Sequence, residues 1–166
     1  MKKRVVVKKG RIVITRNGQV VINLSKRVIN NIKPYCKRIQ VVGSIRREEK
    51  NPVDIDIVLI PKDKEKLEEK MSKLGRFIQG GEKESTWRVK GVKIELYYTN
   101  QEEWGATLLA YSSTTGSSIG LRVVAKKKGF KLTQHGLFKG KKRITGKTEE
   151  EIYKALGRLY KEPKYR

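Results

Sequence analysis

Two short segments of this chain carry side chains whose types and spacing suit phosphoryl or nucleotidyl transfer. Residues 41–47 read Val-Val-Gly-Ser-Ile-Arg-Arg, and residues 54–60 read Asp-Ile-Asp-Ile-Val-Leu-Ile. Because successive side chains of a β-strand point to opposite faces, we expect Asp54 and Asp56 side by side on one face. Two like charges that close repel each other, and a divalent cation between them relieves the repulsion. The pair therefore predicts a magnesium site beside an anion-binding turn.

A third acidic side chain, Glu95, lies on the predicted strand 92–98, where it shares one face with Lys93 and Tyr97. An isolated Glu on a strand is usually just an exposed residue. If this strand lies beside the one that carries the aspartates, Glu95 becomes a third ligand of the same metal centre. Its carboxylate would then complete the site of the catalytic metal and could accept the proton of an attacking hydroxyl.

The Gly-Ser turn before the first aspartate has two interpretations. Gly43 and Ser44 could form an ordinary strand-to-helix turn in which Ser44 caps the helix. Alternatively, the Ser44 hydroxyl, nearby backbone N–H groups and Arg47 bind the β and γ phosphates of a nucleotide. The aspartates that follow at this spacing favour the second interpretation, while Arg46 fits either a phosphate contact or a surface position.

The overall charge points to a polyphosphate partner. The chain has 166 residues, with 40 Lys and Arg against 17 Asp and Glu, a net charge of +23. A solvated basic surface is the alternative, but so large an excess favours nucleic acid. About nine phosphate contacts would give a log–log salt slope of about −8 on duplex DNA.

Other compositional features limit the class of protein. No apolar run approaches the length of about 20 residues that spans a bilayer, and the N-terminus lacks the long apolar core of a secretory signal. A single cysteine, Cys36, excludes an internal disulfide and fits an intracellular protein. We interpret Cys36 as a small packing residue rather than a reactive thiol.

The elements expected to position these residues are mixed. Residues 4–23 suggest a three-stranded antiparallel meander whose last turn is the hairpin signal Asn17-Gly18. An amphipathic helix is expected from about Leu24 to Ile32, with Ser25 as N-cap. The predicted strands are 38–42, 53–60, 86–89 and 92–98, with a charged helix at 64–74.

A change of composition at residues 99–101 marks a candidate hinge. Beyond it we expect helices at 102–111 and 119–128, separated by the Ser/Thr-rich stretch 112–118. A hairpin over 130–139 and a helix from Thr148 to about Leu156, opened by a capping box with Glu151, complete the chain. Trp104 is expected to be a core residue and His135 a structural one. The fold class is therefore α+β, in two parts, 1–100 and 101–166.

These motifs resemble those of the nucleotidyltransferase superfamily and, within it, the family X DNA polymerases. The resemblance covers about residue 24 to the end and rests on 43–47 with 54–56, 93–96, 103–109, 115–117, Arg122, 128–132 and 160–166. It implies a palm over 1–100 and a C-terminal lobe over 101–166 that binds the nascent base pair. With neither a lyase domain nor helix-hairpin-helix clamps, the chain is similar to minimal two-lobe viral members.

The resemblance also implies an activity and a set of site residues. The implied activity is repair-type gap filling, in which two Mg²⁺ ions (with Mn²⁺ as a possible substitute) promote transfer from a dNTP to a primer 3′-hydroxyl with release of pyrophosphate. We expect a monomer that binds gapped or primer-template DNA and no membrane. Asp54, Asp56 and Glu95 would be the catalytic, metal-binding residues. The residues implied to bind the nucleotide are Gly43, Ser44, Arg47, Gly116, Ser118 and Arg122.

The sequence departs from the family pattern in three places. The third carboxylate is Glu95 rather than the usual Asp, and no aromatic residue directly precedes Thr115-Gly116, which leaves the choice between deoxyribose and ribose open. The stretch from Gly116 to Arg122 is also shorter than usual, and Ser118 stands near where an asparagine reads the base. Two alternatives remain. One is a nucleotidyltransferase that is template-independent on DNA ends or that adds nucleotides to RNA or small molecules; the other is a basic duplex-binding module without activity.

Overall fold

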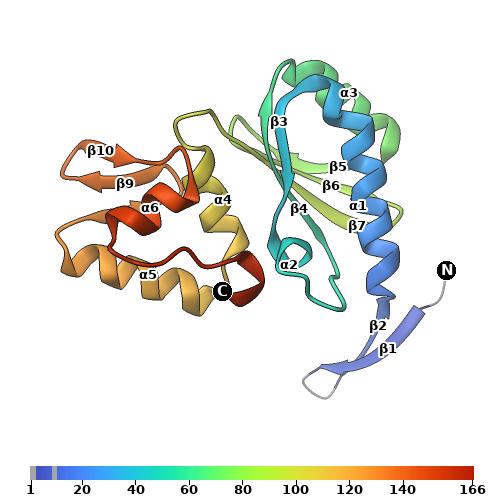
Figure 1. Cartoon of the computed structure of the whole chain (residues 1–166). Helices are drawn as coiled ribbons and strands as arrows, with labels where there is room; N and C mark the ends of the chain where they lie inside the picture. Colours follow the sequence, from blue (N-terminus) through green and yellow to red (C-terminus); the bar gives the residue numbers. More distant parts are fainter. Residues whose placement is uncertain (1–2, 9–10) are drawn as a thin grey trace.

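The structure is a computed structural model that describes residues 3–8 and 11–166, with side chains described from residue 17 onward. A mixed five-stranded sheet forms its centre (Figure 1). Helices α1 and α3 cover one face of this sheet, and a C-terminal lobe built around α4, α5 and α6 lies on the other side. This arrangement confirms the α+β class.

The N-terminal segment differs from the predicted meander. Strands β1 (Lys3–Lys8) and β2 (Arg11–Arg16) form an antiparallel pair that extends away from the sheet at the start of α1 (Figure 1). The turn expected at Lys8-Lys9-Gly10 falls partly on residues 9–10, outside the described residues. The third strand is wrong, because helix α1 (Gly18–Ile32) begins directly after β2.

Asn17 caps this helix instead of forming a hairpin turn. Its side-chain oxygen accepts a hydrogen bond from the backbone N–H of Gln19 at 3.0 Å. Asn is favoured both in tight turns and as an N-cap, so the Asn-Gly pair alone did not distinguish the two. The spacing of Val21, Val28 and Ile32 decides for a helix, since all three are buried against the sheet. Ser25, predicted as the cap, is buried within the helix.

The central sheet has the strand order β3-β4-β7-β6-β5. Pairing is antiparallel between β3 and β4, parallel between β4 and β7, and antiparallel in the remaining two pairs. The edge strand β5 was not predicted, and β4 begins two residues later than expected. The strands are β3 (Cys36–Val41), β4 (Ile55–Pro61), β5 (Arg76–Gly80), β6 (Glu84–Val89) and β7 (Val92–Tyr98).

The two central strands present different faces to the two sides of the sheet. On one face, Ile55, Ile57 and Leu59 of β4 are fully buried and pack with Ile94 and Leu96 of β7. This core is closed by α1 and by α3 (Lys64–Leu74), which matches the predicted charged helix in both bounds. The alternation of the strands leaves the opposite face free for other contacts.

The opposite face binds the C-terminal lobe along part of its length. Val58 and Ile60 of β4 form a separate buried cluster with Trp104 and Leu108 of α4 (Trp104–Ser112). Trp104 is buried in this cluster, as predicted, and the guanidinium of Arg38 lies 4.4 Å from the centre of its ring. Because α4 covers only part of this face, the acidic end of β4 is not buried beneath it.

The C-terminal lobe has its own core and two unpredicted features. Helix α5 begins at Thr115, with the Thr114 side chain accepting a hydrogen bond from the N–H of Ser117, so the predicted seven-residue separation of the helices is wrong. Strand β10 was not predicted. The remaining elements are α5 (Thr115–Lys127), β8 (Lys131–Thr133), β9 (Gly136–Lys139), β10 (Lys142–Thr145), α6 (Glu149–Ala155) and the 3₁₀ turns Lys33–Tyr35 and Pro163–Tyr165.

The predicted capping box of α6 is half formed. The Thr148 hydroxyl accepts from the N–H of Glu151 at 3.1 Å, as expected. The Glu151 carboxylate does not complete the reciprocal bond; it accepts from the Thr145 hydroxyl at 2.7 Å and so ties α6 to β10. In the described part of the chain, no helix is both long and apolar enough to cross a membrane.

Replacement of Asn17 tests the position of the first helix. We expect Asn17→Ala to lower the free energy of unfolding by about 1 kcal/mol, because it removes an N-cap. Asn17→Asp should retain the stability, and Asn30→Ala, on the exposed side of the same helix, serves as a control. Urea denaturation measures all three, and a loss as large for Asn30→Ala would contradict the assignment of the cap.

Candidate active site

The parallel pairing of β4 with β7 brings the predicted acidic residues together. Asp56 lies directly opposite Glu95 in the register of the two strands. Asp54 lies in the bend just before β4, rather than within the strand as predicted, yet its side chain still reaches the same group of charges. The strand that carries Glu95, β7, therefore lies beside β4, as the sequence analysis required for Glu95 to join the aspartates.

Backbone and side chain both hold Asp56 in place. The Val42 N–H donates to the Asp56 carbonyl at 2.8 Å, which connects the Gly-Ser turn to the start of β4. Gly43 begins the short helix α2 (Gly43–Arg46) with φ +61°, a conformation that L side chains rarely adopt. A Cβ at this position would overlap Oδ2 of Asp56. Glycine is therefore required here by its backbone and by the carboxylate beside it.

Lys93 lies among the three carboxylates. Its Nζ atom is 2.9 Å from Oε2 of Glu95 and 4.0 Å from Oδ2 of Asp54. Across the described part of the chain, no three carboxylate, imidazole or thiol groups are arranged as a set of metal ligands. Two of the three carboxylates instead share the Lys93 ammonium.

The electrostatics of this group show how crowded the negative charges are. Burial, followed by the nearby charges of Asp54 and Glu95, raises the pKa of Asp56 to about 6, although Lys93 and a hydrogen bond from Tyr97 act in the opposite direction. The Tyr97 hydroxyl donates to Oδ1 of Asp56 at 3.4 Å. Burial and the same carboxylates raise the pKa of Tyr97 well above its ordinary value, so it remains a donor.

Asp54, Asp56 and Glu95, called the acidic corner below, have side chains whose chemistry suits a hard divalent cation. Carboxylate oxygens are the ligands that Mg²⁺ prefers in proteins, and three of them lie on adjoining strand ends. The missing side chain at Gly43 allows the Asp56 carboxylate to lie against the Gly-Ser turn. A cation would relieve the repulsion that raises the pKa of Asp56, so these residues suit a metal ion.

The residues predicted to bind phosphates lie next to this corner, on α2 and directly after it. Ser44 is in α2 but does not cap it, since Val42 holds the N-cap position. Arg47 donates from Nε and Nη2 to Oε1 of Glu49, at 2.9 and 2.7 Å. The Glu49 side chain is half exposed, and such a pair contributes little to stability. Arg47 can therefore exchange Glu49 for an anionic ligand.

The remaining predicted residues lie on α5, in the C-terminal lobe. Gly116 is in the first turn of this helix rather than in the turn between helices, and nothing lies near the position of its absent Cβ. Ser118 and Arg122 line a small hollow between α4, α5 and β8. Arg122 also borders an open groove of about 730 Å³, together with Lys126, Lys131 and His135.

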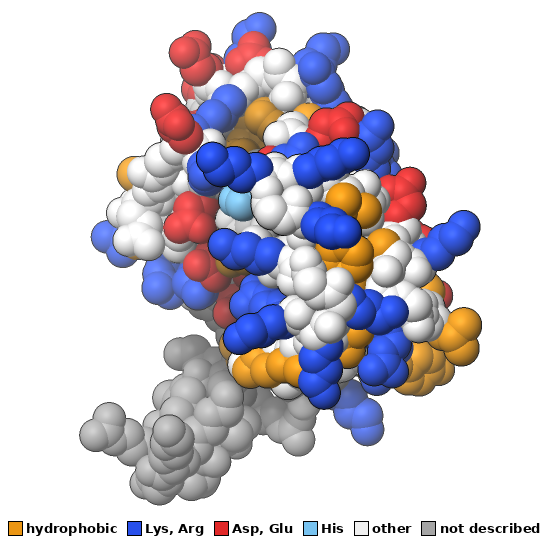
Figure 2. Space-filling view, turned by 90° about the vertical axis from the view of Figure 1, so that its left-hand side faces the viewer, with side chains coloured by type: hydrophobic (Ala, Val, Ile, Leu, Met, Phe, Trp, Pro, Cys, Tyr) orange, Lys and Arg blue, Asp and Glu red, His pale blue; other side chains and the backbone are white. Residues whose placement is uncertain are grey.

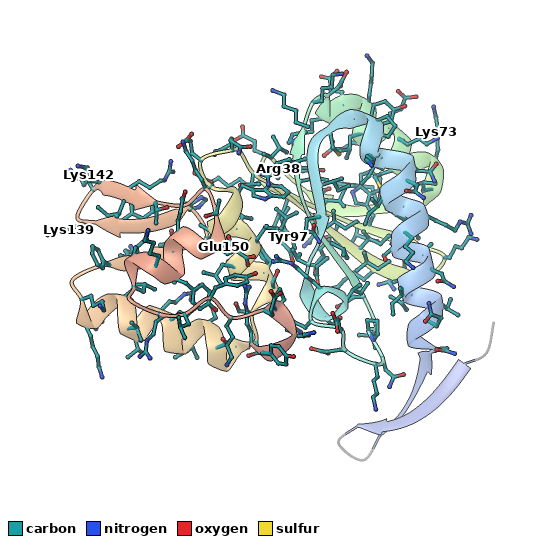
Figure 3. All side chains as sticks on the ribbon, in the orientation of Figure 1. Arg38, Lys73, Tyr97, Lys139, Lys142 and Glu150 are labelled. Atoms are coloured by element: carbon teal, nitrogen blue, oxygen red, sulfur yellow. The ribbon has the colours of Figure 1, made fainter. Side chains whose placement is uncertain are left out.

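Two tyrosines connect the acidic corner with this groove, and the sequence did not indicate their pairing. The rings of Tyr97 and Tyr111 stack with centroids 3.7 Å apart, and Tyr97 lies on the side of the sheet that faces α4 (Figure 3). The Tyr111 hydroxyl donates to Oε1 of Gln134 at 2.9 Å, and Gln134 lines the groove. The alternation of side chains along β7 predicted which face of the sheet carries Tyr97. Its stacking partner, Tyr111, could be identified only from the folded structure.

Another connection between the two sides was also missed. Arg46 donates to both oxygens of Glu149, at 3.0 and 2.7 Å, and to the Ser112 hydroxyl. The C-terminal residue, Arg166, donates to Oε1 of Glu149 at 2.6 Å, and its side chain is fully buried. Arg46 is therefore not a surface residue and is not free to bind phosphate. The structure excludes both interpretations of Arg46.

Comparison with known proteins agrees with this geometry. A family model described as the DNA polymerase beta thumb matches residues 108–166. The chain is 33% identical over 149 residues to the Repair DNA polymerase X of African swine fever virus. The identity is the same for a Kenyan pig isolate and for the Vero-adapted Badajoz strain, and each match covers 81% of this chain and 84% of the viral chain. The chain belongs to the family X DNA polymerases.

A more distant relative agrees with this assignment. DNA polymerase IV of Saccharomyces cerevisiae is 32% identical over 74 residues, which cover 45% of this chain and 13% of the yeast protein. Family membership makes the chain an enzyme of the DNA-directed DNA polymerase class. The C-terminal lobe, which contains the matched residues 108–166, is called the thumb below.

Gly43→Ala tests the close approach of the turn to Asp56. The added Cβ would displace the Asp56 carboxylate, and the alanine would have to adopt a left-handed backbone conformation. We expect this strain to cost about 1–3 kcal/mol of folding free energy. We expect reduced nucleotide incorporation together with a lower free energy of unfolding. Gly81→Ala, in open space between β5 and β6, is the matched control and should change neither measurement.

Glu149 predicts a pH dependence of stability. Burial alone would raise its pKa, but hydrogen bonds from Arg46 and Arg166 outweigh this and hold the pKa below its ordinary value of 4.5. A carboxyl whose folded-state pKa is lowered contributes stability above its unfolded pKa and loses it as the pH falls. The stability of the wild type should therefore fall as the pH drops from about 5 towards 3.

The variant Glu149→Gln isolates this contribution. Urea denaturation between about pH 6 and pH 3 should give a flatter dependence than in the wild type, with lower stability at pH 6 and a smaller difference towards pH 3. Glu150→Gln, on the exposed side of the same helix, should retain the wild-type dependence. Equal pH dependence in the wild type and Glu149→Gln would refute the assignment.

Proposed function

We propose that this polymerase fills short gaps in duplex DNA by transferring a nucleotide from a dNTP to a primer 3′-hydroxyl, with release of pyrophosphate. The observation that carries the proposal is the register of β4 and β7, which sets Asp56 opposite Glu95 with Asp54 beside them. Clustered carboxylates next to a Gly-Ser turn are suited to holding a nucleotide triphosphate through divalent metal ions.

Asp54, Asp56 and Glu95 would hold two Mg²⁺ ions, with Mn²⁺ as a possible substitute. Bound there, the metal would supply positive charge to the oxygens that enter and leave the α-phosphorus. The Tyr97 hydroxyl orients Asp56 by donating to Oδ1. The Glu95 carboxylate would accept the proton of the attacking hydroxyl, and its longer side chain gives it more freedom than an aspartate.

The residues on α2 and directly after it would bind the triphosphate. The Ser44 hydroxyl and the Arg47 guanidinium lie on the segment that follows Gly43, next to Asp56. Arg47 offers a planar pair of donors that suits phosphate oxygens, and it now uses them on a half-exposed Glu49. Ser118 and Arg122, on α5 of the thumb, would contact the nascent base pair, and Gly116 would allow close approach.

Basic residues on two parts of the chain would hold the DNA. On the face of the thumb shown in Figure 2, Lys and Arg side chains outnumber Asp and Glu, and the groove beside α5 is bordered by Arg122, Lys126 and Lys131. Residues 1–47 contain fourteen Lys and Arg and no Asp or Glu. We therefore propose a palm over 1–100 and a thumb over 101–166 that grip the duplex by its phosphates.

Primer extension tests the proposal against a template-independent transferase. The substrates are a one-nucleotide gap with each of the four template bases, and the single-stranded primer alone, each with dNTPs and with ribonucleotides. We expect incorporation directed by the template base and strongest on the gap. Equal extension of the single strand would favour the template-independent alternative, and no incorporation on any substrate would favour a basic DNA-binding module.

Removal of the carboxylates tests their role. We expect Asp54→Asn with Asp56→Asn, and separately Glu95→Gln, to lower the rate of incorporation at least about a hundredfold, because the metal ions lose their ligands. Binding of gapped DNA, measured by fluorescence anisotropy, should be unchanged or stronger because negative charge is removed. Glu65→Gln, on the exposed side of α3, is the control. Full activity of the double variant would overturn the site.

A further inference from the structure

Lys93 makes an unusual contact for a residue beside a proposed metal site. Its ammonium lies 2.9 Å from Oε2 of Glu95 and 4.0 Å from Oδ2 of Asp54. It therefore joins two of the three carboxylates that the proposed function assigns to metal. The third, Asp56, is held separately by Tyr97.

The contact uses carboxylate oxygens that a metal ion would need. A divalent ion that binds Glu95 and Asp54 needs the oxygen atoms that the Lys93 ammonium now contacts, and two cations cannot share that position. The lysine thus neutralises part of the negative charge and competes with a metal ion for the same oxygen atoms.

The contact can also be released easily. The Lys93 side chain is 42% exposed, so its ammonium can turn into solvent, where water replaces the lost hydrogen bond. Glu95 is 28% exposed and reaches out from β7 on a longer side chain than aspartate. An ion pair of this kind stabilises only weakly, and a divalent cation competes for the same oxygens with twice the charge.

We propose that Lys93 is a built-in counter-cation that occupies the metal site of this polymerase until a divalent ion displaces it. It is a positioning residue: it holds Glu95 and Asp54 in ion pairs in the free enzyme and so weakens their affinity for metal alone. Metal that arrives with a nucleotide triphosphate then has the advantage, since the Ser44 and Arg47 segment binds the same ligand. This inference rests on the proposed function of the three carboxylates.

Binding of Mn²⁺ to the free protein tests the inference without any turnover. Mn²⁺ is titrated into the full chain without DNA or nucleotide, and the free ion is followed by its electron paramagnetic resonance signal. We expect Lys93→Met to bind Mn²⁺ about two- to fivefold more tightly than the wild type, the range that corresponds to loss of a partly exposed ion pair. Lys93→Arg, which keeps the charge, should restore the wild-type affinity.

Two controls separate this effect from general changes. Lys83→Met, at an exposed position before β6 beside Tyr98, removes the same charge where no ion pair with the three carboxylates exists, and should leave Mn²⁺ affinity unchanged. Lys93→Met with Glu95→Gln should lose the gain, because the released ligand is absent. Thermal unfolding followed by circular dichroism confirms that each variant is folded.

The outcomes distinguish the inference from the proposed function. Equal or weaker Mn²⁺ binding by Lys93→Met, or an equal gain in Lys83→Met, would overturn the role of Lys93 even if the wild type fills gaps. Absence of gap filling by the wild type would instead overturn the proposed function, whatever the metal titration gives. Tighter binding by Lys93→Met and its reversal by Lys93→Arg would support the counter-cation.

Discussion

The repulsion between neighbouring carboxylates is the interaction around which this structure is arranged. The parallel pairing of β4 with β7 sets Asp56 opposite Glu95, and the bend before β4 brings Asp54 to the same place. Burial, followed by the two neighbouring charges, raises the pKa of Asp56 to about 6, so the site disfavours the charged form of this carboxyl. A fold that depended only on stability would not place three acids here.

Several contacts hold this unfavourable group in position. The sheet behind it is filled by isoleucines and leucines that α1 and α3 bury completely, so the strands cannot separate to relieve the repulsion. The Val42 N–H fixes the Asp56 backbone, Tyr97 donates to its carboxylate, and Gly43 leaves it space. Charge is balanced locally by Lys93. The rigid core therefore provides the stability that the acidic corner lacks.

The same sheet face also connects the corner to the thumb. Tyr97 stacks on Tyr111, which bonds to Gln134 at the basic groove, while Arg46 reaches from the Gly-Ser segment to Glu149 of α6. Glu149 also neutralises the buried Arg166, so the last residue of the chain belongs to the junction of the two parts. Lys139 and Lys142, at the outer end of the β9–β10 hairpin, extend the basic surface away from the acidic corner (Figure 3).

The sequence by itself determined the α+β class, the charged helix 64–74, the pair of strands around Lys90-Gly91 and the acidic residues, because apolar periodicity and turn chemistry are local signals. It failed at Asn17-Gly18, where a helix cap and a hairpin turn share the same residues. It also failed at the short edge strands β5 and β10, which pair with their neighbours β6 and β9 but bury no residue and so show little apolar alternation. The contacts of Glu95 with Lys93, of Tyr97 with Tyr111 and of Arg46 with Glu149 and Arg166 were decided by the tertiary structure alone. Strand register and the junction of the two parts join residues up to 103 positions apart, and no local pattern encodes which distant partner a side chain meets.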